Sequence, residues 1–243
     1  MKLQRLDKTV AKLTGSTRSE VTALIRRGRV CVDGDVCRDP ARKIDPDTAS
    51  VTVEGRETTY REHVYFMVNK PSGLLCVSRD PHAPTVADLA PAQYRRRALF
   101  PAGRLDKDSC GLVLLTDDGD FAHRLLSPKK AIFKRYLVRV DAPVGQDVID
   151  AFAAGVTLAD GTSCLPAGLR VIEDGDRPLT EVTIREGRYH QIKRMFGVYG
   201  CGVCFLKRVA IGGLQLDETL PESECRLLTE QEIALIFEAN AVK

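Results

Sequence analysis

The stretch PAGRLDKDSCGLVLLTDDG, residues 101–119, joins a glycine-flanked loop to a continuous apolar run. Asp106 lies in the loop, two positions after Arg104 and five before Gly111. The run GLVLLT has the length and composition of a buried strand. Catalytic groups are often carried on loops at strand ends, but aspartate is also a common turn former. The pattern by itself leaves a catalytic and a purely structural interpretation open.

The composition is that of a globular protein without disulfide bonds. The chain has 243 residues, 44% of them hydrophobic and 28% charged, which is enough for one or two domains with proper cores. Its eight cysteines are too sparse and irregular for a secreted disulfide scaffold. The opening Met1-Lys2-Leu3 begins no signal peptide, and no segment has the roughly 20 apolar residues of a membrane span. We therefore expect a cytoplasmic protein with no membrane partner.

Basic residues gather in three segments, although the net charge of the chain is only +3. Residues 1–30 contain eight of them against two acids, residues 129–139 five and no acid, and residues 185–208 six against one. A single cluster of this kind is most simply a solvated surface. Three clusters, each beside a motif described below, favour RNA or DNA as the partner, because phosphates attract local cation density.

The first sixty residues predict two short helices and a hairpin. Apolar residues at helical spacing indicate one helix that ends at Gly15 and a second, capped by the serine or threonine at 16–17, that ends at Gly28. Asp33-Gly34 is a preferred two-residue hairpin turn. A polar connector near residues 56–62 follows, and we expect it to be a linker.

The segment QRLDKTVAKLTGSTRSEVTALIRRGRVCVDGDVCRDPARKI, residues 4–44, resembles the S-four-like RNA-binding domain. The resemblance implies binding to structured RNA through shape and phosphate contacts rather than base reading. We expect this domain to cover residues 1–58, and the alternative is a helical adaptor without a nucleic-acid role. Its candidate RNA-binding residues are Arg18, Arg26, Arg27 and Arg29.

Strands and helices intermix beyond residue 63 without regular β-α-β alternation. The order favours an α+β core on a mixed, largely antiparallel sheet. Strands are predicted at 64–68, 111–116, 132–140, 168–172 and 179–184, and helices at 120–126, 145–155, 188–200 and 227–239.

Several familiar cofactor and metal motifs are missing from the sequence. It has no phosphate-cradling P-loop, no dinucleotide fingerprint and no nucleophile elbow. Cys201 and Cys204 form a single C-x-x-C, whereas a structural zinc site needs four ligands, usually from two such pairs. We therefore expect no metal and no cofactor, and interpret these two cysteines as small apolar fillers of a strand.

Four ordered segments resemble the pseudouridine synthases that act on ribosomal RNA, and the resemblance covers nearly the whole chain. GRLDKDSCGLVLLTDDG matches the family's catalytic motif, with Ser109 where threonine is commoner. YFMVNKPSG, residues 65–73, matches the first core strand and its turn. KRYLVRV carries the tyrosine motif at Tyr136, and EGRYHQIKRMF carries the third motif, with Lys193 at its basic position. We expect this catalytic domain to cover residues 63–243.

The resemblance implies a reaction that detaches uracil from ribose, turns it and rejoins it through carbon, without a cofactor. Asp106 is the implied catalytic nucleophile, because a carboxylate can bond to, or stabilise, a positive sugar carbon. Tyr136 would stack on a uridine flipped out of the RNA. Lys193 is the implied cation partner that keeps Asp106 ionised. The pocket should be closed and largely dry, so that the base is retained while it turns.

Four further basic residues are candidate RNA contacts: Arg104, Arg188, His190 and Arg194. Arg104 would hold the RNA backbone or fill the gap left by the base, and its alternative is a salt bridge that shapes the loop. His190 would otherwise be a packing residue of its helix. Tyr136, without the resemblance, is an ordinary strand aromatic.

The looser segments RDPHAPTVADL and TDDGDFAHRLLSPK favour the family members that act on small-subunit (16S) ribosomal RNA. The alternatives are a synthase for large-subunit (23S) RNA and a non-catalytic assembly factor that binds ribosomal RNA. The intact Asp106, Tyr136 and Lys193 argue against the assembly factor. We expect a monomer whose partner is 16S RNA or an intermediate of small-subunit assembly.

Overall fold

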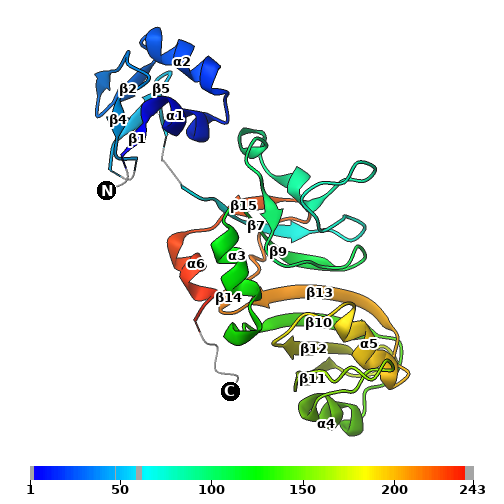
Figure 1. Cartoon of the computed structure of the whole chain (residues 1–243). Helices are drawn as coiled ribbons and strands as arrows, with labels where there is room; N and C mark the ends of the chain where they lie inside the picture. Colours follow the sequence, from blue (N-terminus) through cyan, green and yellow to red (C-terminus); the bar gives the residue numbers. More distant parts are fainter. Residues whose placement is uncertain (1–2, 47, 59–61, 239–243) are drawn as a thin grey trace. The chain divides into compact units, whose positions relative to one another are not determined.

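The computed structural model describes residues 3–46, 48–58 and 62–238 (Figure 1). These residues form two compact units. The first unit holds the described residues up to Val64 together with Ala90–Leu99, and the second holds Tyr65–Leu89 and the described residues from Phe100 onward. Within the described ranges, no helix is long and apolar enough to cross a membrane.

The first unit begins with the two predicted helices. α1 (Leu6–Thr14) ends at Gly15, which adopts a left-handed φ of 67°. α2 (Arg18–Arg26) begins with a capping box, in which the Thr17 hydroxyl accepts from the Glu20 amide and the Glu20 carboxylate accepts from the Thr17 amide. The strands of this unit are β1 (Gln4–Arg5), β2 (Val30–Val32), β3 (Asp35–Val36), β4 (Lys43–Ile44), β5 (Val51–Val53) and β6 (Arg56–Thr58).

The hairpin predicted at Asp33-Gly34 is confirmed, because both residues have positive φ and join β2 to β3. The linker expected near residues 56–62 is wrong in its first part. Residues 56–58 form β6, which pairs with β5 across a second tight turn at Glu54-Gly55, where φ is 50° and 77°. That turn has the same acid–glycine chemistry as the first, and the polar composition around it concealed the strand.

The core of the first unit is built from apolar side chains at helical and strand spacing, such as Val10, Ile25 and Val51. One acidic group is buried at its margin. The Asp7 carboxylate accepts from the guanidinium groups of Arg5, at 2.8 Å, and Arg18, at 3.2 Å. The hydrogen bond from Arg5, reinforced by Arg18, lowers the pKa of Asp7 to about 2.

The second unit is an α+β domain on a mixed sheet, as the sequence predicts. Among the described residues the strand order is β11-β12-β10-β13-β9-β7-β15, with β14 added to β13 and β8 to β9. The neighbours are antiparallel except for β9 and β13, which run parallel. The strands are β7 (Tyr65–Lys70), β8 (Phe100–Pro101), β9 (Cys110–Thr116), β10 (Lys134–Val140), β11 (Gly168–Glu173), β12 (Leu179–Ile184), β13 (Val203–Ile211), β14 (Leu214–Gln215) and β15 (Cys225–Leu227).

Gly111 allows the close approach of β9 to β13 at the start of the parallel pairing. Its φ is 94°, and a Cβ atom at this position would collide with the carbonyl oxygen of Arg208. Any other residue would therefore strain the backbone and separate the two strands. The glycine that follows Asp106 in the motif thus determines how the loop before β9 enters the sheet.

Four helices pack on this sheet or at its ends: α3 (Gly119–Leu126), α4 (Gln146–Ala154), α5 (Gln191–Val198) and α6 (Glu230–Leu235). α5 buries Ile192, Met195 and Phe196 on one face, as its apolar spacing predicts. In Figure 1, α4 and α5 lie at the end of the sheet formed by β10–β12, away from α3 and α6.

The sequence indicated the nine-residue strand β13 only through the interpretation of Cys201 and Cys204 as strand residues, and predicted no bounds for it. Its first half exposes Cys204 and Phe205, so its burial does not alternate cleanly. The interpretation of both C-x-x-C cysteines as strand fillers is correct only in part, because Cys201 is buried before the strand and Cys204 is exposed within it. In the described part of the chain, no group of three or more His, Cys, Asp or Glu residues is arranged to hold a metal ion.

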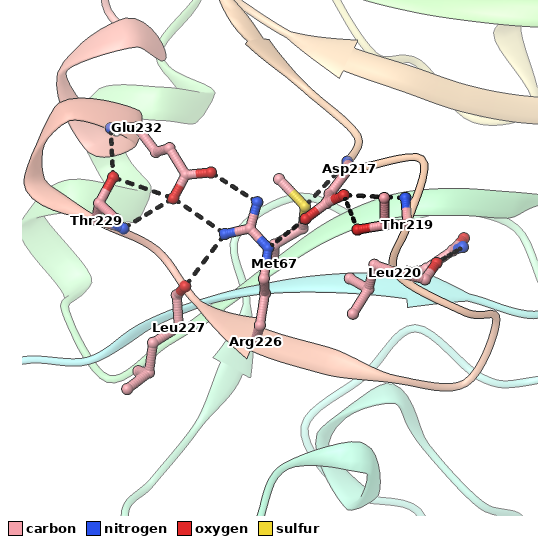
Figure 2. Close-up of polar contacts among 9 residues, drawn as sticks. Met67, Asp217, Thr219, Leu220, Arg226, Leu227, Thr229 and Glu232 are labelled. Atoms are coloured by element: carbon pink, nitrogen blue, oxygen red, sulfur yellow. Dashed lines mark hydrogen bonds and ion pairs between the residues drawn. The ribbon is translucent and has the colours of Figure 1, made fainter.

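Arg226 of β15 ties the C-terminal segment to the sheet (Figure 2). Its guanidinium donates two hydrogen bonds to the Glu232 carboxylate of α6, at 2.7 and 3.0 Å, and one to Asp217 at 2.7 Å. Glu232 also forms a capping box with Thr229 at the start of α6. This network links α6 to β15 and to the segment that follows β14.

Candidate active site

Asp106 lies in the loop between β8 and β9, and a buried lysine holds that loop in place. Lys70, the last residue of β7, is fully buried. Its ammonium donates to the carbonyl oxygens of Ser109 at 2.6 Å, Lys107 at 3.1 Å and Pro71 at 3.1 Å. These bonds satisfy all three ammonium donors. Burial lowers the pKa of Lys70. Two of the three carbonyls, those of Lys107 and Ser109, belong to the segment directly after Asp106, so Lys70 anchors that segment to the end of β7.

Two basic side chains from the first turn of α5 face the Asp106 carboxylate. Lys193 Nζ lies 3.4 Å from Oδ2, and His190 Nε2 lies 3.5 Å from Oδ1. His190 is the N-cap residue of α5, in a left-handed conformation with φ of 48°. A negative group beside this turn is also favoured by the helix dipole. The structure therefore places Asp106 beside the predicted cation, Lys193, and beside a second group for which the sequence indicated only packing or RNA contact.

Lys193 is shared between two carboxylates. It donates to both oxygens of Asp108, at 2.6 and 2.7 Å, which are shorter distances than the 3.4 Å to Asp106. The hydrogen bond from Lys193 is the main reason that the pKa of Asp108 is lowered. Asp108 is mostly exposed, whereas only 26% of the Asp106 side chain is exposed.

Asp106 opens into a cavity of about 1130 Å³ that Tyr136 also lines. Tyr136 comes from the middle of β10 and is 7% exposed. A smaller adjoining recess of about 80 Å³ again includes Asp106, Tyr136 and His190. The carboxylate thus shares a cavity with Tyr136 and faces an ammonium group, but 26% of its side chain is exposed, so the pocket is more open than the closed one that we expected.

A buried glutamine braces the cavity wall at residues 186–190. Gln191 accepts from the amide of Arg188 at 3.0 Å and donates to the Glu186 carboxylate at 2.9 Å. The Tyr189 side chain projects from this loop with 74% exposure, and its ring stacks on His190 with a centroid distance of 3.9 Å. Tyr189 and His190 both line the cavity.

Only some of the other candidate RNA-binding residues line the cavity that contains Asp106. Arg104 and Arg188 line the cavity, and Arg188 also pairs with Glu186 at 3.0 Å. Arg194 does not line the cavity and pairs with Asp160 instead. Arg18 pairs with Asp7, and the remaining three candidates of the first unit are exposed, namely Arg26, Arg27 and Arg29.

Sequence reasoning did not single out Lys70, Gln191, Lys134 or Arg208 as parts of the site. Lys70 could have been identified as a residue of interest because it is a charged residue at the end of the mostly apolar strand VYFMVNK. Lys134 lies two positions before Tyr136, so strand periodicity could have placed both on one face. Arg208 lies in the second half of β13, beyond the two cysteines that indicated a strand, so nothing local indicated its position.

The assembled groups suit a nucleophilic or charge-stabilising carboxylate next to an aromatic platform. Asp106 has two basic neighbours to balance its charge, and Tyr136 offers an apolar ring in the same cavity. Such a pair can bind a flat base and stabilise positive charge at an adjacent carbon.

Comparisons with known proteins agree with this geometry. The RNA pseudouridylate synthase family matches residues 64–197, and the S4 domain matches residues 4–49. Ribosomal small subunit pseudouridine synthase A of Salmonella typhimurium is 43% identical over 236 residues, which are 96% of this chain and 99% of that protein. The Escherichia coli K12 protein of the same name is 42% identical with the same coverage.

Two more relatives cover almost the whole chain. An uncharacterized RNA pseudouridine synthase of Bacillus subtilis strain 168 is 42% identical over 98% of this chain and 100% of its own length. The crystal structure of a pseudouridylate synthase is 39% identical, covers 96% of this chain and 99% of its own, and superposes with a TM-score of 0.67. The chain therefore belongs to the RNA pseudouridine synthase family, in the branch that carries an N-terminal S4 domain.

Proposed function

We propose that the chain isomerises a uridine of small-subunit (16S) ribosomal RNA to pseudouridine, acting as a monomer with Asp106 as the catalytic carboxylate. The position of Asp106 carries this proposal, because it lies 3.4 Å from Lys193 in a cavity that Tyr136 lines. The small-subunit target is supported by the relatives named for that activity, which align over nearly their whole length.

Each residue has a distinct task in this proposal. A uridine inside folded RNA cannot reach Asp106, so it must be flipped into the cavity, where Tyr136 stacks on the base. As the glycosidic bond breaks, the sugar carbon becomes positive, and the Asp106 carboxylate stabilises it or bonds to it. Lys193 and His190 hold that carboxylate in position, and Arg104 contacts the RNA backbone at the cavity.

Residues 1–58 serve as an RNA anchor in the same proposal. Arg26, Arg27 and Arg29 are exposed around the end of α2, where they are available to phosphates. Replacing Arg26, Arg27 and Arg29 together with alanine should therefore raise the Kd for ribosomal RNA at least tenfold at physiological salt, whereas the melting temperature should change little, because all three side chains are exposed. An unchanged Kd would remove the anchoring role.

Pseudouridine mapping in a strain that lacks this gene tests the function and the target together. One position in 16S RNA should lose its pseudouridine and regain it with the wild-type gene but not with Asp106→Asn. Purified Asp106→Asn should bind the RNA within about twofold of wild type and show no turnover. Loss of a pseudouridine from 23S RNA would favour the large-subunit alternative, and full activity of Asp106→Asn would overturn the catalytic assignment.

A further inference from the structure

Two cations lie on the sheet face beside Tyr136. Lys134 and Tyr136 are two positions apart on β10, so their side chains point to the same side of the sheet. Arg208 of β13 is the direct cross-strand partner of Tyr136, which places it on that side as well. All three residues line the cavity that contains Asp106. The tyrosine ring is thus flanked by an ammonium and a guanidinium group.

Neither cation has an acidic partner in the described part of the chain. Arg208 is 3% exposed, donates from Nε to the Leu112 carbonyl at 2.7 Å, and leaves Nη2 buried without a partner. The two acids that line the cavity are engaged elsewhere, since Asp106 faces Lys193 and His190, and Glu186 pairs with Arg188.

Burial of two like charges side by side is costly, because each disfavours the charged form of the other. Burial, together with the charge of Arg208, lowers the pKa of Lys134 to about 8. The group still carries its proton at neutral pH. A positive charge without an acidic partner in a low-dielectric cavity wall does not stabilise the fold. It does strongly stabilise negative charge that forms next to it.

The reaction of the proposed function creates such a charge, and the inference rests on that function. The glycosidic bond joins C1′ of the ribose to N1 of uracil. When this bond breaks, its electron pair stays on the ring and is delocalised over N1, O2 and O4. A base stacked on Tyr136 would hold its O2 or O4 atom near one of the flanking cations. Phosphates need no buried site, because the exposed Arg104, Arg185 and Arg188 line the same cavity.

We propose that Lys134 is a catalytic residue that donates a hydrogen bond to a uracil oxygen and stabilises the detached, negatively charged base, with Arg208 as a second positive charge behind it. The step balances without a co-reactant. The C1′–N1 pair moves onto the base while Asp106 stabilises C1′. The base then turns, C5 forms the new bond to C1′, the C5 proton is released to solvent, and N1 takes up a proton.

Single-turnover rates and RNA affinities of two Lys134 variants test this role. Lys134→Met should lower the single-turnover rate about 100-fold, the usual cost of losing one preorganised donor, with the Kd for RNA within twofold of wild type. Lys134→Arg, which keeps the charge and the donors, should recover most of the rate. Lys207→Met is the matched control, since Lys207 precedes Arg208 on β13 and does not line the cavity, and it should keep the wild-type rate.

Three outcomes would overturn the proposal. Lys134 would be a phosphate ligand if Lys134→Met raised the Kd for RNA severalfold and left the single-turnover rate unchanged. The salt dependence of the Kd would then also fall by the equivalent of about one phosphate contact. An unchanged rate and Kd would give it no role in the reaction. A rate that falls equally in Lys134→Met and Lys134→Arg, with a lowered melting temperature, would make it structural. The wild-type and Asp106→Asn proteins, measured in parallel, test the proposed function independently, because their difference does not depend on Lys134.

Discussion

Lys193 Nζ contacts Asp106 at 3.4 Å and Asp108 at 2.6 Å, so one ammonium group bridges two carboxylates of the same loop. The shorter contact goes to the exposed acid and the longer one to the acid in the cavity. The bridge attaches the loop before β9 to the first turn of α5. It therefore fixes the position of Asp106 through a residue that is distant in sequence.

Removing the ammonium should affect turnover more than removing the exposed acid. Lys193→Met leaves the partly buried Asp106 carboxylate without its lysine and should lower kcat about 100-fold. Asp108→Asn should stay within a few fold of wild type, because an exposed ion pair contributes about 0–1 kcal/mol. Steady-state kinetics on an RNA substrate measure both effects. A larger loss in Asp108→Asn would mean that the bridge, rather than the contact to Asp106, positions the carboxylate.

Lys70 should be required for the shape of the catalytic loop rather than for contact with RNA. Lys70→Met removes three hydrogen bonds to backbone carbonyls and should lower the free energy of unfolding by about 2 kcal/mol. Displacement of the loop should lower kcat by 10- to 100-fold, with little change in the Kd for RNA. Urea denaturation and kinetics measure these two effects. Lys129→Met, at an exposed lysine, is the control and should change neither quantity.

Asp7 should make the stability of the first unit sensitive to acid. Its folded pKa of about 2 lies below the ordinary aspartate value of 3.8, so its contribution is complete above about pH 5 and disappears as the pH falls toward 2. Asp7→Asn should therefore cost about 1–2 kcal/mol at pH 7 and much less at pH 3. Urea titrations of the full chain, followed by NMR signals of Val21 and Ile25, measure the difference. An equal cost at both pH values would show that packing, not charge, is what the substitution removes.

Tyr189 should contribute a stacking contact to RNA, because its ring is 74% exposed, stacked on His190 and part of the cavity wall. Tyr189→Ala should raise the Kd for RNA roughly 5- to 30-fold, in line with about 1–2 kcal/mol for a base–aromatic stack. Tyr189→Phe should bind normally, since stacking needs no hydroxyl group. Fluorescence anisotropy measures both. Tyr199→Ala, at a tyrosine outside the cavity, should have no effect, and an equal loss in Tyr189→Phe would point to a hydrogen bond instead.

Local sequence signals were sufficient for most of the elements. The capping boxes of α2 and α6, the glycine at the end of α1 and the turn at Asp33-Gly34 depend on residues a few positions apart. The interactions that define them form within one turn of the chain, so composition and spacing predict them. Strands of two or three residues, such as β8, β14 and β15, were not predicted because they are too short to show alternation. β6 was concealed by its polar composition, and β13 exposes Cys204 and Phe205 near its start, which breaks the alternation there.

The sequence by itself determined the family and the order of the motifs, and it singled out Asp106 as the candidate carboxylate, because short motifs are recognised from residue types and their spacing alone. Only the tertiary structure decided which groups surround Asp106. Lys193 and His190 reach it because α5 buries Ile192, Met195 and Phe196 against the core, and Arg208 reaches Tyr136 through the register of β13 on β10. Helix packing and strand register are set by burial between distant segments, and no local pattern encodes the distances that result.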